Sequence, residues 1–344
     1  MKWWTAVLWF LMLVAVGATV WSQTPPDNTY FRPFAARSAG ELLAGIIDIG
    51  ADSSGRVIVA DGKRGIVLLL DADLRVIGQV GRKGSGPGEY REIQAVQGTR
   101  GGFVTADRVL RRLYVYNWAG SRPQLAHTIT LDFEPYDFCV PSKGKFIVLG
   151  RRNGARLHIL DSINGAIVQS GARFAANVSV ALSDNVVEGR LSCGGSKMIL
   201  LTSAWVPSFD LIASHNIEIT RTDSIGPVRK LAITQTKGRL SFSSGPQGYQ
   251  SPSRAFEYDR NWILPAATIA RIDGVEDDSS FYFLRTADGA AIANWKRNDK
   301  LFPISRDSAV SVVETLEIVL KKVAIADVVR EGMANATRKD RARK

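Results

Sequence analysis

Three features of this sequence predict an all-β fold, in which four-stranded antiparallel sheets repeat around a ring behind a signal peptide. Short apolar strands and tight turns recur along the chain at a nearly constant spacing. A glycine-rich stretch, Val80 to Tyr90, stands where one repeat passes to the next. Hydrophobic residues make up 45% and charged residues 22% of the 344 residues, which is ordinary for a globular protein and sufficient for one large domain.

The repeat is clearest in the first half of the chain. Strands that end at Asp71, Asn117 and Asp161 lie 46 and 44 residues apart, and each is preceded by a shorter apolar strand and a basic turn. A period of this length, made of strands and turns without a helix, is typical of the blades of a β-propeller. One blade cannot bury both of its faces, so its neighbours in a ring must cover them, and ring closure removes long free edges.

The same pattern predicts where the blades lie. Four-stranded blades are expected over residues 46–80, 93–131, 136–169, 187–220 and 263–304, and residues 237–260, rich in serine and glycine, should form a long loop. Residues 308–320 fit either a helix or strands, and residues 323–329 read as a strand. We expect the N-terminal residues around 30–34 to complete a sixth blade and close the ring. The propeller then occupies residues 41–329 and has six blades.

The stretch Gly84-x-Gly86-Pro87-Gly88-Glu89-Tyr90 cannot be the interior of a helix or of a central strand, because glycines and a proline crowd it. It resembles the blade-to-blade connection of NHL-like six-bladed β-propellers, and the resemblance covers residues 46–161. The resemblance implies architecture and no substrate. We expect the glycines to permit a tight path from an outer strand to the next inner strand, with Tyr90 packed between the two blades. The stretch matches neither a Walker loop nor a dinucleotide-binding fingerprint.

The two ends of the chain differ in character. Lys2 precedes an uncharged apolar run from Trp3 to Trp21, which predicts a signal peptide over residues 1–22, cleaved after Ala18 or Ser22. An uncleaved membrane anchor is the alternative. Residues 23–40 read as a linker with a possible ring-closing strand, and residues 330–344 as a basic disordered tail. Either N-terminal reading places the propeller outside the cytoplasm, in the periplasm or secreted.

Few residues suggest metal, redox or nucleophilic chemistry. Cys139 and Cys193 can form one disulfide or remain two buried thiols, and the second reading is slightly favoured. The histidines are His127, His158 and His215. His158 is expected in a third strand and His127 in a fourth, far from the channel, so a three-histidine metal site is not expected. Carboxylates gather at residues 132–137 and 276–278, where solvated turns are the simpler reading. We therefore predict no metal site and no cofactor, and leave catalytic residues unassigned.

Basic residues recur at one position of the repeat. The net charge is +11, and in the first three blades the turn between the second and third strands is basic. Such turns share a face of the disc with the crossovers, so eight cations should lie together on that face: Lys63, Arg64, Arg82, Lys83, Arg111, Arg112, Arg151 and Arg152. These side chains either attract an anionic partner or are solvated charges, some of them paired with Asp61, Asp107 or Glu89.

The sequence thus favours a binding module over an enzyme. The basic face suits a protein, an acidic glycan or a lipid headgroup, while nucleic acid is disfavoured by export from the cytoplasm. Membrane contact is expected only through an uncleaved N-terminal segment. The alternative is an enzyme of the lactonase or lyase type with its site at the mouth of the channel, and the fold is compatible with both.

Overall fold

The computed structural model describes residues 31–33, 39–142, 144–173, 189–193, 198–203, 208–224, 232–236, 239–243, 247–250, 254–259, 261–272, 275–277, 280–286, 291–314 and 318–342. The predicted signal peptide over residues 1–22 and most of the predicted linker lie outside these ranges. Within them, no helix is both long enough and apolar enough to cross a membrane.

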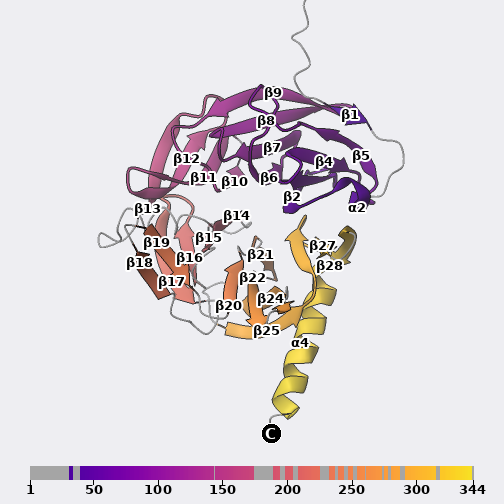
Figure 1. The fold of residues 1–344 in the computed structure, drawn as a ribbon, viewed down its shortest axis with the longest axis vertical. Helices are drawn as coiled ribbons and strands as arrows, with labels where there is room; N and C mark the ends of the chain where they lie inside the picture. Colours follow the sequence, from indigo (N-terminus) through magenta and orange to yellow (C-terminus); the bar gives the residue numbers. More distant parts are fainter. Residues whose placement is uncertain are drawn as a thin grey trace, which may run out of the picture.

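Antiparallel sheets stand around a common centre and form a disc (Figure 1). In the first three blades the strands follow one another from the centre to the rim, as in a propeller. These strands are β2 (Ile46–Ala51), β3 (Val57–Asp61), β4 (Ile66–Leu70) and β5 (Val76–Val80); β6 (Ile93–Gly98), β7 (Gly102–Asp107), β8 (Arg112–Ala119) and β9 (Arg122–Thr130); β10 (Asp137–Ser142), β11 (Lys145–Arg152), β12 (Ala155–Asp161) and β13 (Ile167–Arg173).

The remaining sheets complete the disc. The fourth blade contains β14 (Gly189–Cys193), β15 (Met198–Ser203), β16 (Ser208–Ala213) and β17 (Glu218–Ser224). The fifth contains β20 (Gln247–Gln250), β21 (Phe256–Tyr258), β22 (Asn261–Ile272), β23 (Val275–Asp277), β24 (Ser280–Arg285) and β25 (Ala291–Arg297). The sixth contains β26 (Lys300–Pro303), β27 (Ser308–Glu314) and β28 (Ile318–Ala324), and a separate hairpin is formed by β18 (Ala232–Thr236) and β19 (Arg239–Ser243).

The predicted blades agree with the structure as far as the fourth. From the fifth blade on, the predicted strands are assigned to the wrong blade or missed. Residues 237–260, predicted as a long loop, contain β19, β20 and β21, of which the last two pair with β22. The strand at 301–304, assigned to the fifth blade, is β26 and pairs with β27 in the sixth. Residues 308–320, left undecided, contain β27 and the beginning of β28. Serine and glycine obscured the period-two pattern in β19 and β20.

The C-terminal prediction was wrong in two respects. The strand predicted at 323–329 and the disordered tail predicted at 330–344 are largely one helix, α4 (Ile325–Ala342), which extends away from the disc in Figure 1. Ile325 and Val328 lie one helical turn apart and are buried against Ile263 and Leu301. This apolar stripe holds the first turns of α4 against the fifth and sixth blades.

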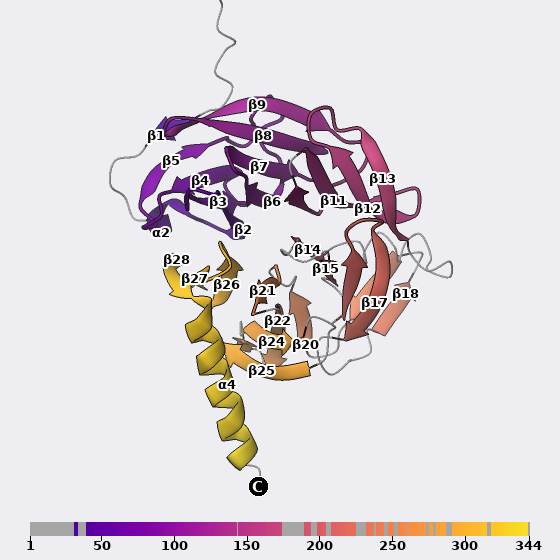
Figure 2. The ribbon, with the colours of Figure 1, turned by 180° about the vertical axis from the view of Figure 1, so that it is seen from behind.

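The ring closes by side-chain packing rather than by the predicted N-terminal strand in the sixth blade. Strand β1 (Arg32–Pro33) pairs with β5, at the outer edge of the first blade, as Figure 2 also shows. The boundary between the first and sixth blades is filled from both blades and from α2 (Ala39–Leu42), by a cluster that includes Leu42, Leu43, Val57, Leu68, Phe302, Val310 and Val312.

The glycine-rich crossover behaves as predicted. Residues 81–90 run from β5 toward β6 without a helix, and Tyr90 is fully buried. The ring of Tyr90 packs with Ile58 and Leu69 of the first blade and with Tyr114 of the second. The Tyr90 hydroxyl lies 2.7 Å from that of Tyr116 and accepts a hydrogen bond from Thr105. The side chain thus fills the wedge between two blades.

One disulfide crosses a boundary between blades. Cys139 of β10 and Cys193 of β14 are bonded, with their Cα atoms 5.9 Å apart, so the slight preference for two free thiols was wrong. Both residues lie in the innermost strands of their blades and belong to one hydrophobic cluster. Their separation of 54 positions hid this proximity in the sequence.

Candidate functional site

The eight predicted cations lie in turns and crossovers that are linked to one another, on what we call the crossover face. This face comprises the turns β3–β4, β7–β8 and β11–β12 with the crossovers 81–92 and 131–136. A Cβ atom placed on Gly65 would lie 2.8 Å from Cγ of Lys83, and Nη1 of Arg112 donates to the Ser85 carbonyl at 3.1 Å. The turns β3–β4 and β7–β8 therefore meet the first crossover.

Within the first crossover, Arg82 is paired. Its Nη2 lies 2.6 Å from Glu89 Oε1, and its Nε donates to the same oxygen at 2.7 Å. The backbone N–H of Gly86 also donates to Glu89, and together with Arg82 it lowers the pKa of that carboxyl. The sequence analysis named Glu89 as a possible partner of these cations, and Arg82 is indeed paired with it.

Carboxylates of the second crossover, residues 131–136, form ion pairs with arginines at the turns β7–β8 and β11–β12. Arg152 donates to both carboxylate oxygens of Asp132 at 2.7 and 2.9 Å, and Arg111 lies 3.9 Å from Glu134. Arg108, which the sequence analysis did not single out, bridges Glu92 at 2.8 Å and Glu134 at 3.5 Å. These carboxylates offset part of the positive charge of the crossover face.

The other predicted partners have a different role. Asp61 accepts hydrogen bonds from the backbone N–H groups of Ala44 and Arg64, and Asp107 from those of Arg91, Glu92 and Leu110. These two buried carboxylates hold the turns in place instead of pairing with guanidinium groups. The Arg64 side chain donates to the Leu42 carbonyl at 2.6 Å, which links its turn to α2.

Two cations of this face differ from the arginines. Lys63 and Lys83 are exposed, and neither makes an ion pair with any residue that the structure describes. They belong to the turn and the crossover that touch at Gly65, so they lie on the same part of the disc. Arg151, also predicted, lies near the end of β11, directly before Arg152, and is half-buried.

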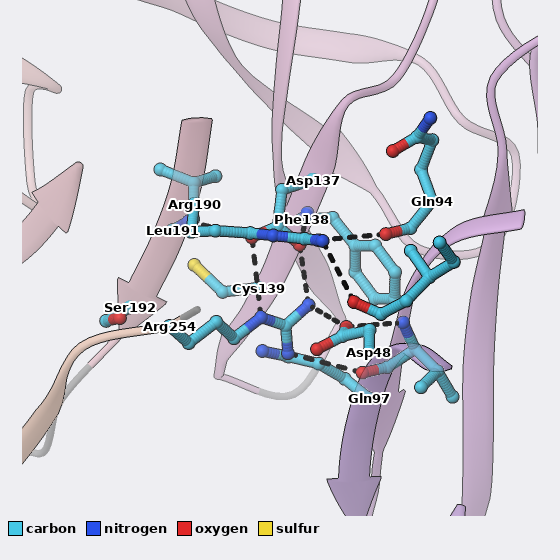
Figure 3. A network of polar contacts seen from close by, with 12 residues as sticks. Asp48, Gln94, Gln97, Asp137, Phe138, Cys139, Arg190, Leu191, Ser192 and Arg254 are labelled. Carbon is cyan, nitrogen blue, oxygen red and sulfur yellow. Dashed lines mark hydrogen bonds and ion pairs between the residues drawn. The ribbon is translucent and has the colours of Figure 1, made fainter. Parts of the chain in front are cut away.

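A second cluster of charged side chains, which sequence analysis missed, lies at the centre of the ring (Figure 3). We call Asp48, Asp137, Arg190 and Arg254 the central network. Nη2 of Arg254 lies 2.8 Å from Asp48 Oδ2 and 2.5 Å from Asp137 Oδ1. Arg190 donates to the carbonyls of Gln94 at 2.8 Å and Ile47 at 3.0 Å. All four side chains are buried and come from four different blades.

The backbone completes the network. Asp48 accepts from the N–H of Val96, and Asp137 accepts from the N–H groups of Phe138 and Leu191. Burial raises the pKa of Asp48, while Arg254 and Arg190 act in the opposite direction. The pKa of Arg254 is raised by the two carboxylates against the opposing effect of burial. The network is therefore two carboxylates and two guanidinium groups that neutralise one another, and it joins the blades across the ring.

The carboxylates of residues 132–137 thus divide between two places. Asp132 and Glu134 lie in the crossover as expected, whereas Asp137 is fully buried, so the solvated-turn interpretation was wrong for it. A signal existed, since Asp48 lies within an apolar innermost strand and Asp137 stands at the beginning of another. The partners Arg190 and Arg254 lie far away in the sequence, and no spacing rule connects them.

The histidines stay apart. His158 is fully buried in β12, and His127 in β9 bonds through Nε2 to the Ser162 carbonyl at 2.9 Å. In the described part of the chain, histidines, cysteines and carboxylates nowhere gather in a group of three that could hold a metal ion.

Comparisons with known proteins agree on the fold. Residues 40–162 match a family described as a 6-bladed beta-propeller, in agreement with the six blades that the NHL-like resemblance implied. A Bacteroides fragilis protein described as a candidate exported protein is similar in structure, with a TM-score of 0.54, 11% identity and 83% of each chain covered. At this identity the likeness shows the fold alone. No curated protein matches this sequence.

Two further solved structures are less similar. A Bacteroides caccae protein of unknown function has a TM-score of 0.47 and 9% identity, with 74% of this chain and 82% of the other covered. BamB from Moraxella catarrhalis has a TM-score of 0.39 and 13% identity, with 82% of this chain and 97% of the other covered.

Proposed function

We propose that this protein is an extracytoplasmic binding module whose crossover face docks an anionic partner. The observation that carries the proposal is the excess of cations there. The eight predicted basic side chains, together with Arg91 and Arg108, make ten, and the carboxylates of the same turns and crossovers are the six of Asp61, Glu89, Glu92, Asp107, Asp132 and Glu134. Lys63 and Lys83 make no ion pair within the described residues, and each is exposed. An uncompensated positive surface raises the association rate of an anionic partner.

Three observations support the extracytoplasmic location. The disulfide between Cys139 and Cys193 is of a kind that persists in oxidising compartments. The apolar run from Trp3 to Trp21 has the composition of an export signal. The B. fragilis protein of similar fold is itself described as a candidate exported protein.

Binding is a better reading than catalysis in the channel. The charged groups at the centre of the ring are buried and bond to one another and to backbone groups. A lactonase or lyase needs an acid or base with access to substrate. An acidic glycan is the partner that we take forward, because its repeated carboxylates match several cations on one face.

The proposal is tested by reversing the two unpaired charges. We expect Lys63→Glu/Lys83→Glu to weaken retention on immobilised acidic glycan by about thirtyfold or more at low salt, since each cation near an anionic surface contributes about 1 kcal/mol. The measurement is surface plasmon resonance at several salt concentrations. Vesicles containing phosphatidylglycerol form a second arm, which distinguishes a lipid headgroup from a glycan.

A matched variant separates this face from net charge. Arg75→Glu/Lys321→Glu makes the same change in charge at exposed residues outside the crossover face, and should retain wild-type binding. A wild-type protein that binds neither surface, or equal losses in the two variants, would reject the proposal.

A further inference from the structure

The face opposite the crossover face is hollowed at the centre of the ring. Two adjoining cavities open there, of about 1000 Å³ and about 300 Å³, and they share Ala51, Gly98, Ile304 and Ser305 as lining residues. Their walls come from the turns β2–β3, β6–β7 and β10–β11 and from the loop between β26 and β27. The larger volume is at the upper end of the range for sites of drug-sized ligands.

Cations without partners line this double cavity. Arg100, Lys145 and Lys322 line the larger part and Arg306 the smaller. All four are exposed, and none makes an ion pair with a residue that the structure describes. This differs from the crossover face, where most arginines already bond to carboxylates or to carbonyl groups.

The carboxylate that lines the cavity is already occupied. Asp52 accepts at Oδ1 from the N–H and hydroxyl of Ser54 and from the N–H of Arg56, at 2.7 to 3.0 Å. Its other oxygen lies 3.9 Å from Arg56. Asp307 belongs to the same loop as Arg306 but is not among the lining residues. The cavity therefore has a net positive charge, and a concave wall concentrates its field.

The wall also offers neutral hydrogen-bonding groups. Hydroxyl and amide side chains from four blades line it: Ser53, Thr99, Asn117, Ser162, Ser305 and Ser308. Apolar surface from Ile49, Phe256 and Trp262 lines the smaller part. Arg254 also lines the smaller part, but its guanidinium already contacts Asp48, Asp137 and the Val96 carbonyl. The central network therefore forms a floor of the cavity.

We propose that this cavity binds a small anion that carries several hydroxyl groups, such as a sugar acid or a sugar phosphate. The cations would bind the acid group, and the hydroxyl and amide side chains would exchange hydrogen bonds with the sugar ring. This site is separate from the crossover face and does not depend on the function proposed there.

The test uses isothermal titration calorimetry with trigalacturonate and with glucose 6-phosphate, which separate a carboxylate from a phosphate source. At least one probe should bind the full-length protein, and neutral galactotriose should bind much more weakly. Arg100→Gln/Lys322→Gln should weaken binding of that probe by about tenfold or more, because charge-assisted hydrogen bonds are lost. Higher salt should weaken binding in the same direction.

Two variants serve as controls. Arg75→Gln/Lys321→Gln removes the same charge from residues that do not line the cavity, and should bind as the wild type does. Lys63→Glu/Lys83→Glu should also leave this binding unchanged, which separates the cavity from the crossover face. No binding of either probe at millimolar concentration, equal binding of galactotriose, or full binding by the Arg100/Lys322 variant would each overturn the proposal.

Discussion

His158 lies inside the third blade with both of its ring nitrogens in use. Nε2 faces the Gly150 carbonyl at 3.1 Å, and since a carbonyl only accepts, this nitrogen carries the proton. Nδ1 then accepts from the Ser170 hydroxyl at 2.8 Å. Burial lowers the pKa of His158 to about 4, because a charged ring in this place would lose its hydration.

This lowered pKa makes the stability depend on pH. An unfolded chain has the ordinary histidine pKa of 6.5, so it takes up a proton before the folded chain does. His158 therefore contributes fully to stability above pH 6.5, and its contribution is lost as the pH falls toward 4. The loss amounts to at most about 3 kcal/mol.

We expect His158→Gln to flatten the pH dependence of the free energy of unfolding between pH 6.5 and 4, as measured by urea titration. His127→Gln, which removes an imidazole from the neighbouring blade, is the control and should keep the wild-type slope. Equal slopes in the two variants would show that His158 is not the source.

Single residues also mark the limit of what the sequence could predict. Tyr90 was predicted between two blades because one glycine-rich segment contained both the bend and the ring that fills it. Asp137 was misread because its guanidinium partner, Arg254, is 117 residues away. Contacts within a repeat leave a trace in the spacing of residues, whereas contacts across the ring depend on closure and leave none.

At the scale of elements, the first crossover depends on a glycine. Gly81 has a φ of 78°, and a Cβ placed on it would lie 2.3 Å from Cε2 of Tyr90. An alanine there must adopt a left-handed backbone and also displace the ring that fills the wedge between blades. The crossover and the blade boundary are thus built around the same close contact.

Gly81→Ala should lower the free energy of unfolding by about 2–4 kcal/mol, combining backbone strain with overpacking. Gly120→Ala is a matched control, because Gly120 has a φ of 66° but no neighbouring atom within 4 Å of the added Cβ. It should cost only about 1 kcal/mol. Urea unfolding of both variants checks the difference, and equal losses would refute the steric argument.

Elements with a strong period were predictable, and those without one were not. Strands β2 to β13 follow a repeat that alternates apolar strands with polar turns, so their places could be predicted closely. Strands β20 and β21 pair with a single long strand, β22, and this branching has no counterpart in the earlier blades. Helix α4 has a short apolar stripe near Ile325 and a basic end, which favoured a strand followed by a tail.

At the scale of the whole molecule, the central network joins blades that are not neighbours in the sequence. Arg254 reaches from the fifth blade to Asp48 in the first and Asp137 in the third. Removing one member of a buried ion pair leaves an uncompensated charge, which costs more than the pair contributes. The network therefore makes the opposite sides of the disc depend on one another.

We expect Arg254→Met to lower the free energy of unfolding by about 3–5 kcal/mol. Adding Asp48→Asn and Asp137→Asn should restore much of this loss, because no buried charge then lacks a partner. Arg152→Met breaks the exposed pair with Asp132 and should cost about 1 kcal/mol or less. A triple variant less stable than Arg254→Met alone, in urea unfolding, would contradict this account of the network.

The disulfide between Cys139 and Cys193 has a mechanical consequence. It ties the third blade to the fourth, which in a ring of six is the boundary opposite that between the sixth and the first. That opposite boundary, between the first and sixth blades, is packed by side chains around α2. A force that pulls the first and sixth blades apart would open the disc at their boundary, while the disulfide holds the third and fourth blades together. A reducing agent would remove this covalent link.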